Sequence, residues 1–223
     1  MKVAIVGNGP SYIDYDGWGD VVVGCKLGAP LPLKYEFTTN CNPKIFNRIL
    51  EDSTWSVQFK TKQIFPPHMH YHLKTKYTTD EQVYIKSKMD IPYDKELYKL
   101  LPTPFQPDLK KSVMKHRTGF AYNNTLKRIS TGHWSIIFSM IIFKTSEIRC
   151  YGFDAHFDPK LKLYSTSHAI TTDEVERDRR RNAGWDYIKG AVYWNETVNF
   201  LRELYQIPIQ LVPPKQYKSL YFV

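Results

Sequence analysis

The residues with the clearest chemical potential lie near the start of the chain, in the run Gly7-Asn8-Gly9-Pro10-Ser11. Glycines permit positive φ angles and let backbone N–H groups approach a phosphate closely. Asn8 is suited to hydrogen-bond a ribose or phosphate, and Ser11 to cap a following helix and touch the ligand. The run matches neither the G-x-G-x-x-G fingerprint nor the phosphate-binding loop with its lysine. It therefore predicts a nucleotide-binding turn built from Asn8, Gly9, Pro10 and Ser11, with a plain tight turn as the alternative.

A second cluster is formed by His68, His70 and His72. If this segment is a strand, the three imidazoles share one face, and that spacing permits a metal site. No nearby carboxylate completes such a site. We therefore predict no metal ion and no cofactor, and we interpret the segment as a basic loop.

The turn at Gly7 follows Lys2–Val6, a β-branched apolar run that is typical of a buried strand opening an α/β nucleotide-binding domain. Similar patterns predict strands at Val21–Val23, Tyr35–Thr38, Trp55–Lys60, Ile148–Tyr151 and Ile207–Val212, and helices at Pro43–Leu50, from Ser130 to about Phe143, at Thr172–Asn182 and at Ala191–Tyr205. In the last of these helices, Val192, Val198, Leu201 and Leu204 make the expected core face.

Strands and helices alternate at both ends of the chain, which predicts a mostly parallel sheet with helices on both faces. We expect one Rossmann-like α/β domain over residues 1–223. Residues 61–125 hold many Lys, Tyr and Pro residues, so we expect short elements there and a small lid or insertion within that domain. Ligands bind beyond the carboxyl ends of parallel strands. Gly7–Ser11, Asn40–Pro43 and Gly152–Asp154 should therefore converge on one crevice.

Composition narrows the function classes. Lys and Arg number 31 against 22 Asp and Glu, a formal net charge of +9, which favours an anionic partner such as nucleic acid, a nucleotide or a membrane surface. No run of about 18 apolar residues exists, so we expect no membrane insertion. Three cysteines without a C-x-x-C motif indicate thiols in a reducing compartment, hence a cytoplasmic protein, or the host cytoplasm if the gene belongs to a phage.

Several segments resemble sialyltransferase-type glycosyltransferases, with the bacterial family 42 enzymes nearer and family 29 more distant. The opening VAIVGNGPS followed by DVVVGC is similar to theirs, and so is RISTGHWSIIFSMIIFKTSEIRCYGFD, from Arg128 to Asp154. Asn42-Pro43 falls where those enzymes carry Asn-Pro after the third strand, and FLRELYQIPIQLVPP resembles their last helix and strand. The resemblance implies a variant of the GT-A fold and a transferase that uses a nucleotide-sugar donor without a metal.

The resemblance also implies roles for individual residues. Asn8, Gly9 and Ser11 would lie near the donor phosphate and ribose, and Asn42 would contact the nucleotide. A second wall would consist of Ser130, Thr131, Gly132 and the equally placed His133, with Arg128 near the sugar or acceptor. Lys26 stands where the family carries an asparagine. A lysine there would pair with a diphosphate, so a UDP-sugar stays open beside a CMP-sugar.

Glycosyl transfer needs a base for the acceptor hydroxyl and positive charge or hydroxyl donors for the leaving phosphate. The family's histidine before the last helix has no counterpart in DYIKGAVYWNE. The remaining candidates are His168 as base, Asp154 as a rival base and Tyr164 as donor to the leaving phosphate.

Two acceptors fit this hypothesis: a surface glycan, and a hydroxymethylated base in DNA, as in phage DNA modification. The positive charge spread from Lys60 to Arg181, interleaved with tyrosines, favours DNA. A non-catalytic nucleic-acid-binding module and a metal-dependent nucleotide hydrolase are the alternatives. The sequence leaves the oligomeric state open.

Overall fold

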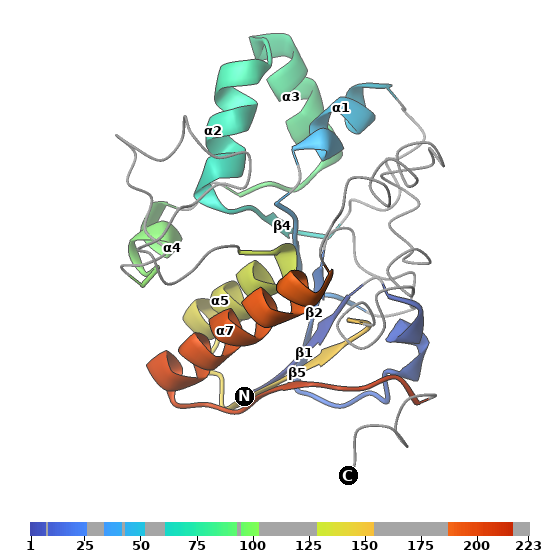
Figure 1. Ribbon diagram of the computed structural model, residues 1–223. Helices are drawn as coiled ribbons and strands as arrows, with labels where there is room; N and C mark the ends of the chain where they lie inside the picture. The colour runs from blue at the N-terminus through green and yellow to red at the C-terminus, as the bar shows by residue number, and fades with distance from the viewer. Residues whose placement is uncertain are drawn as a thin grey trace.

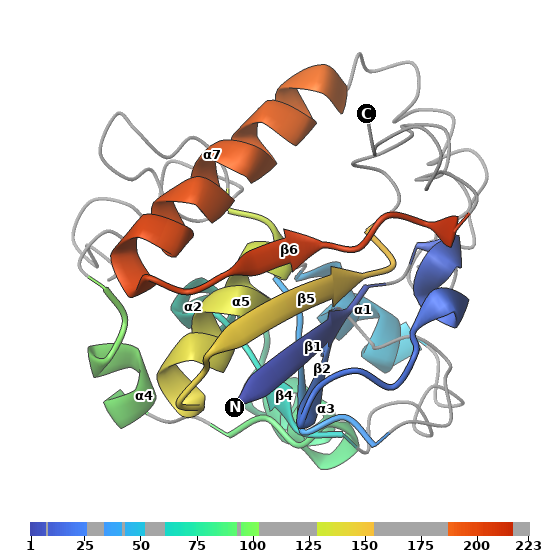
Figure 2. The same ribbon diagram turned by 90° about the horizontal axis from the view of Figure 1, so that it is seen from below.

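The computed structural model describes residues 1–7, 9–25, 34–41, 43–51, 61–92, 95–102, 129–153 and 187–215. Within them, a parallel sheet of six strands runs in the order β4-β3-β2-β1-β5-β6 (Figures 1 and 2). The strands are β1 (Lys2–Val6), β2 (Val21–Cys25), β3 (Phe37–Thr39), β4 (Gln63–Ile64), β5 (Glu147–Tyr151) and β6 (Ile209–Leu211). The α/β class and the parallel sheet predicted from the sequence are confirmed.

The first strand lies at the centre of the sheet because its residues tolerate burial on both faces. Val3, Ala4, Ile5 and Val6 are all fully buried. Val3 pairs with Val21 of β2 on one side and with Ile148 of β5 on the other. The chain moves outward from β1 through β2, β3 and β4, and then returns to the opposite side of β1 as β5. The order in which strands are added therefore reverses between β1 and β5, and this position is the topological switch point of the sheet.

The helices have these bounds: η1 (Pro10–Asp14, a 3₁₀ turn), α1 (Lys44–Glu51), α2 (Pro67–Lys76), α3 (Thr79–Lys88), α4 (Lys95–Lys99), α5 (Thr131–Ile142) and α7 (Tyr187–Tyr205). Helix α5 packs across β1, β2 and β3, and α7 packs against α5 (Figure 1). The short turn η1 contacts β5.

The main core lies between the sheet and helices α5 and α7. Trp134, Ile137 and Phe138 of α5 are at most 1% exposed, and Val198 and Leu201 of α7 join them against the strands. Burying a side chain of this size stabilises the fold by roughly 1.5–3 kcal/mol. Leu204 does not belong to this core face as the sequence predicts, because 44% of it is exposed.

A second core belongs to α1, α2 and α3, which gather at one end of the molecule (Figure 1). We call these three helices the helical module. Phe46 of α1, Met69 of α2 and Ile85 of α3 are fully buried there. The module joins the sheet through β4, where the Gln63 N–H donates to the Asp90 carbonyl over 2.7 Å.

Most predicted elements appear, with shifted bounds. Helices α1, α5 and α7 and strands β1, β2, β3, β5 and β6 are confirmed. The sequence does not predict β4, and His68, His70 and His72 lie on helix α2 rather than on a strand. The elements at 61–125 that the structure describes are short, as expected. The strand at Trp55–Lys60 and the helix at Thr172–Asn182 fall outside the described residues.

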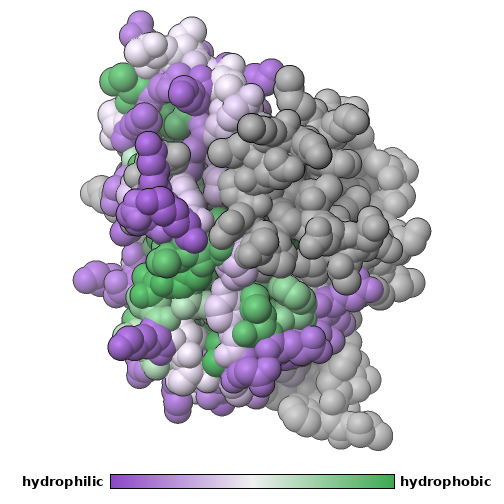
Figure 3. Space-filling view, turned by 90° about the vertical axis from the view of Figure 1, so that its left-hand side faces the viewer, coloured by the Kyte–Doolittle hydropathy of each residue, from purple (hydrophilic) through white to green (hydrophobic). Residues whose placement is uncertain are grey.

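Apolar surface interrupts the polar exterior on the face that carries α4, α5 and α7 (Figure 3). At the carboxyl ends of these helices, Leu100, Ile142 and Leu204 are exposed. None of the helices in the described part of the chain has the length and apolarity to cross a membrane.

Candidate functional site

The candidate site lies beyond the carboxyl ends of β1 and β5, where the sheet changes direction. In open parallel sheets this switch point is where ligands bind. The turn Gly7–Ser11 follows β1, and Gly152 and Phe153 follow β5. The carboxyl end of β3 and the amino end of α5 meet nearby, since Cys41 Sγ and Thr131 Oγ1 are 2.9 Å apart. The described residues of these three strand ends therefore lie near one another, and their convergence on one crevice stays a prediction.

Gly7 and Gly152 are glycines because the ends of β1 and β5 lie too close together there for a side chain. A Cβ at Gly7 would lie 2.7 Å from the Gly152 carbonyl oxygen, and one at Gly152 would lie 2.8 Å from the Gly7 oxygen. Gly152 also has a φ of +71°, which side chains other than glycine rarely adopt. Larger residues at these two positions would push β1 and β5 apart.

Two backbone amides of the turn are already engaged. The Gly7 N–H donates to the Tyr151 carbonyl over 2.7 Å, and the Gly9 N–H donates to the Gly152 carbonyl over 2.8 Å. These amides hold the turn against β5 and are not directed at a phosphate, in contrast to the sequence-based expectation. Gly9 is the N-cap residue of η1 and Pro10 begins it, so the predicted capping role of Ser11 is wrong. Ser11 is 9% exposed within this turn.

The amino end of α5 forms the second part of the candidate site. Ser130 is its N-cap: the Ser130 Oγ accepts from the His133 N–H over 3.4 Å, and the Ser130 N–H donates to His133 Nδ1 over 3.0 Å. This reciprocal pair is a capping box in which histidine takes the usual place of glutamate. The N–H groups of Thr131 and Gly132 have no acceptor within the helix, and the helix dipole favours an anion there.

His133 has a packing role that the sequence does not reveal. Its ring stacks on the indole of Trp194 with centroids 4.3 Å apart, and its Nε2 lies 3.4 Å from the Trp194 carbonyl oxygen. Because Nδ1 accepts from Ser130, the ring carries its proton on Nε2. The side chain is 2% exposed. His133 therefore holds the first turn of α5 against Trp194. The sequence predicts instead that it faces the nucleotide-sugar donor.

Phe153 packs between the turn after β1 and the amino end of α5. Its ring carbons lie 3.1 Å from the position of a Cβ at Gly7 and 2.5 Å from that of a Cβ at Gly132. The ring also packs on Trp194, with centroids 5.1 Å apart. Gly132 is thus required by aromatic packing, because a Cβ there would lie 2.7 Å from the indole as well. Sequence reasoning missed Phe153 and Trp194. Their signal was an aromatic residue directly after a strand-end glycine and a tryptophan on an apolar helix face.

The carboxyl ends of β2 and β3 support α5 through small polar groups. Cys25 Sγ and Ser135 Oγ are 3.2 Å apart, one helical turn beyond the Cys41–Thr131 contact. Cys25 and Cys150 are buried free thiols, as expected from the sequence. These contacts fix the position of α5 relative to the ends of β2 and β3.

The remaining predicted site residues lie outside the described residues. They comprise the three catalytic candidates and four of the donor-binding candidates: Asp154, Tyr164, His168, Asn8, Lys26, Asn42 and Arg128. Within the ranges that the structure describes, no group of three His, Cys, Asp or Glu side chains could hold a metal ion.

Comparison with solved structures gives the same fold. The sialyltransferase CST-II, in complex with a trisaccharide acceptor and CMP, matches with a TM-score of 0.51 and 18% sequence identity, over 96% of this chain and 82% of that one. A single-substitution variant of CST-II in complex with CMP matches with a TM-score of 0.52 at the same identity and coverage.

No protein-family model matches the sequence, and no curated protein matches it significantly. At 18% identity the likeness is one of fold. This chain has the sialyltransferase fold, with one parallel sheet whose switch point lies between β1 and β5.

Proposed function

We propose that this chain is a glycosyltransferase that moves a sugar from a cytidine-type nucleotide-sugar to a hydroxyl acceptor. One observation carries the proposal. The turn after β1 and the amino end of α5 lie beside each other at the switch point, with the Phe153 ring packed against both, in a fold shared with an enzyme whose structures contain CMP. A UDP-sugar, suggested by Lys26, is the second donor to test.

The first turn of α5 is the best candidate for the donor phosphate. The amides of Gly7 and Gly9 are engaged with β5, and the Ser130 hydroxyl accepts from the His133 N–H, which leaves the N–H groups of Thr131 and Gly132 for an anion. The Ser130 residue is exposed, whereas Thr131 is half-buried against Cys41. An anion here gains from the helix dipole, by typically 0.3–1 kcal/mol at an exposed site.

In the proposed reaction, a base removes the proton from the acceptor hydroxyl as its oxygen bonds to the anomeric carbon. The bond to the phosphate oxygen breaks, and that oxygen keeps the electron pair. His168 or Asp154 is the proposed base, and Tyr164 is the proposed donor to the leaving phosphate. These assignments are hypotheses that follow from the resemblance and from the residue types.

A thermal-shift screen tests the donor class. A nucleotide at 100 times its Kd stabilises the folded state by about 2.7 kcal/mol. We expect CMP to raise the melting temperature and GMP, the purine nucleotide with the same single phosphate, to leave it unchanged. A shift with UDP in place of CMP would reassign the donor. If none of the three shifts the melting temperature at millimolar concentration, the transferase proposal loses its basis.

DNA as acceptor stays a prediction. Of the basic residues that motivated it, Lys62, Lys74 and Lys76 are exposed at and beside the helical module, and many of the others lie outside the described residues. Binding to DNA-cellulose that weakens steeply with salt would support a DNA acceptor. Absent or salt-independent binding would favour a glycan acceptor instead.

A further inference from the structure

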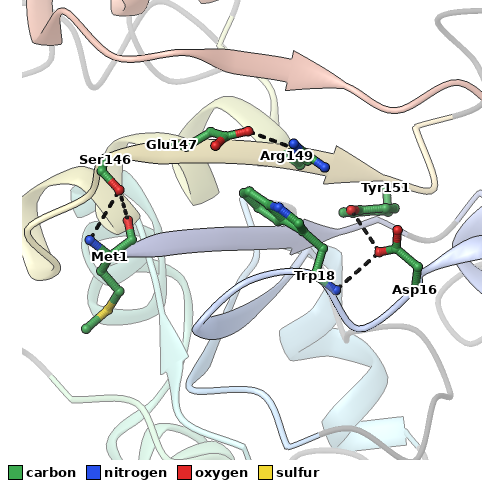
Figure 4. A network of polar contacts seen from close by, with 7 residues as sticks. All are labelled: Met1, Asp16, Trp18, Ser146, Glu147, Arg149 and Tyr151. Carbon is green, nitrogen blue, oxygen red and sulfur yellow. Dashed lines mark hydrogen bonds and ion pairs between the residues drawn. The ribbon is translucent and has the colours of Figure 1, made fainter.

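The sheet face opposite α5 carries a polar cluster at the end of β5 (Figure 4). Alternate residues of β5 point to opposite faces: Ile148 and Cys150 are buried in the main core, while Glu147, Arg149 and Tyr151 face the segment between η1 and β2. That segment contributes Asp16 and Trp18. None of these five residues is among the site residues predicted from the sequence.

Asp16 and Tyr151 form the centre of this cluster. The Tyr151 hydroxyl donates to Asp16 Oδ1 over 3.1 Å, and the Trp18 N–H donates to the same oxygen over 3.2 Å. The edge of the Tyr15 ring meets the Tyr151 ring, with centroids 5.1 Å apart and planes at 82°. Burial and the adjacent carboxylate both raise the pKa of Tyr151, so its hydroxyl stays protonated and keeps donating.

The charge state of Asp16 supports the same bond. Partial burial alone would raise its pKa, but the hydrogen bonds from the Trp18 N–H and the Tyr151 hydroxyl and the nearby Arg149 charge outweigh it and lower the pKa. The carboxylate is therefore ionised at neutral pH. A charge-assisted hydrogen bond is shorter and stronger than one between neutral groups.

Tyr151 holds the turn at both of its ends. Its carbonyl accepts from the Gly7 N–H, and the next carbonyl, that of Gly152, accepts from Gly9. Its side chain binds Asp16 and Tyr15, which directly follow η1. The chain is thus held by Tyr151 both before the turn, at Gly7, and after it, at Asp16, and Ser11 lies between these two contacts.

We propose that Asp16 and Tyr151 are positioning residues for the nucleotide site: their hydrogen bond fixes the segment after η1, and with it the Gly9–Ser11 turn, against β5. This inference rests on the proposed function, because it names what holds one side of that site. Both residues act through the backbone of the turn.

The variants Tyr151→Phe and Asp16→Ala remove the hydrogen bond, whereas Asp16→Asn keeps an oxygen that can accept it. We expect the Kd for CMP to rise about five- to ten-fold in the first two and to rise less in Asp16→Asn, which can keep the hydrogen bond but not the charge. Glu147→Gln is the matched control. It weakens an ion pair with Arg149 on the same strand and face, 3.0 Å long, and should leave the Kd unchanged.

Hydrogen exchange separates this inference from the proposed function. The amides of Gly7 and Gly9 should exchange faster in Tyr151→Phe than in wild type, while the amides of α3 keep their protection. If wild-type protein binds no CMP yet these two amides respond, the positioning role stands and the nucleotide assignment fails. If CMP binds and neither the Kd nor the exchange of Gly7 and Gly9 changes in Tyr151→Phe, the positioning role is refuted. An Asp16→Asn variant as weak as Asp16→Ala would refute it too.

Discussion

The main core and the helical module are built from similar apolar side chains but hold their polar groups at different places. In the main core, His133 and Ser135 form hydrogen bonds around the amino end of α5. In the helical module, two histidines of α2 are largely buried: His68 forms a hydrogen bond with the Cys41 backbone, and His70 lies between the rings of Phe65 and Tyr98. The polar groups of the main core therefore order the start of a helix, whereas burial of the two histidines makes the stability of the module depend on pH.

This contrast assigns different consequences to similar substitutions. A change in the main core should alter nucleotide binding as well as stability, because the same contacts aim α5 at the crevice. A change in the helical module should alter stability alone. Variants in the two cores should therefore differ in nucleotide binding even where their losses of stability are equal.

The largest effect is expected from Gly132→Val. The new Cβ would lie 2.5 Å from the Phe153 ring and 2.7 Å from Trp194, so the helix must move away from both. Overpacking of this kind costs about 3 kcal/mol, which urea denaturation measures. We also expect CMP binding to be lost. Ile142→Ala, at the exposed end of the same helix, is the control and should cost under about 1 kcal/mol with CMP binding intact. A Gly132→Val protein that binds CMP like wild type would mean that the crevice does not depend on this contact.

A pH effect of intermediate size is expected from the helical module. Burial lowers the pKa of both His68 and His70 from 6.5 to about 4, and neighbouring positive charges contribute. The unfolded chain binds these two protons near pH 6.5, whereas the folded protein binds them near pH 4. The free energy of unfolding is therefore fully maintained above pH 6.5 and falls as the pH drops toward 4.

Urea denaturation at pH 7 and at pH 5 measures this loss. The double variant His68→Gln/His70→Gln should show a smaller difference between the two pH values than wild type. His72→Gln, on the same helix but less buried, should behave like wild type. An unchanged pH dependence in the double variant would show that the two histidines do not carry the acid sensitivity.

The smallest effects are expected from a matched pair of substitutions at two helix N-caps. Ser130 caps α5 and Thr78 caps α3, and each takes part in a capping box. Replacing either by alanine should cost about 1 kcal/mol of stability. Only Ser130→Ala should also weaken CMP binding, because only α5 faces the crevice. Equal CMP affinities in the two variants would remove the distinction between the cores.

The sequence predicted the architecture where local signals were strong. Hydrophobic patterns alone indicate two strands, Lys2–Val6 and Glu147–Tyr151, and the helix α5. The alternation of strands and helices along the chain implies a parallel sheet. Strand β4 has only two residues, too few for a pattern, and it forms by pairing with β3. The packing of α1, α2 and α3 into one module also cannot be predicted from local patterns, because its core joins Phe46 to Met69 and Ile85 across a long stretch of sequence.

The sequence indicates the strand ends around the candidate site but not the packing there. Glycine is required at positions 7 and 132 because of Gly152, Phe153 and Trp194, which are distant in sequence. Helix capping by a histidine such as His133 leaves no distinctive motif, and the donor-binding roles of Gly132 and His133 stay predictions. The Asp16–Tyr151 bond joins residues 135 positions apart and has no local signature.

The central claim is that a cytidine nucleotide binds between the turn after β1 and the amino end of α5. Amide chemical-shift perturbation on titration with CMP tests it most directly. The account predicts shifts at Gly9–Tyr12 and at Ser130–His133, with the amides of α2 and α3 unmoved. Shifts confined to the helical module, or none at saturating CMP, would contradict it.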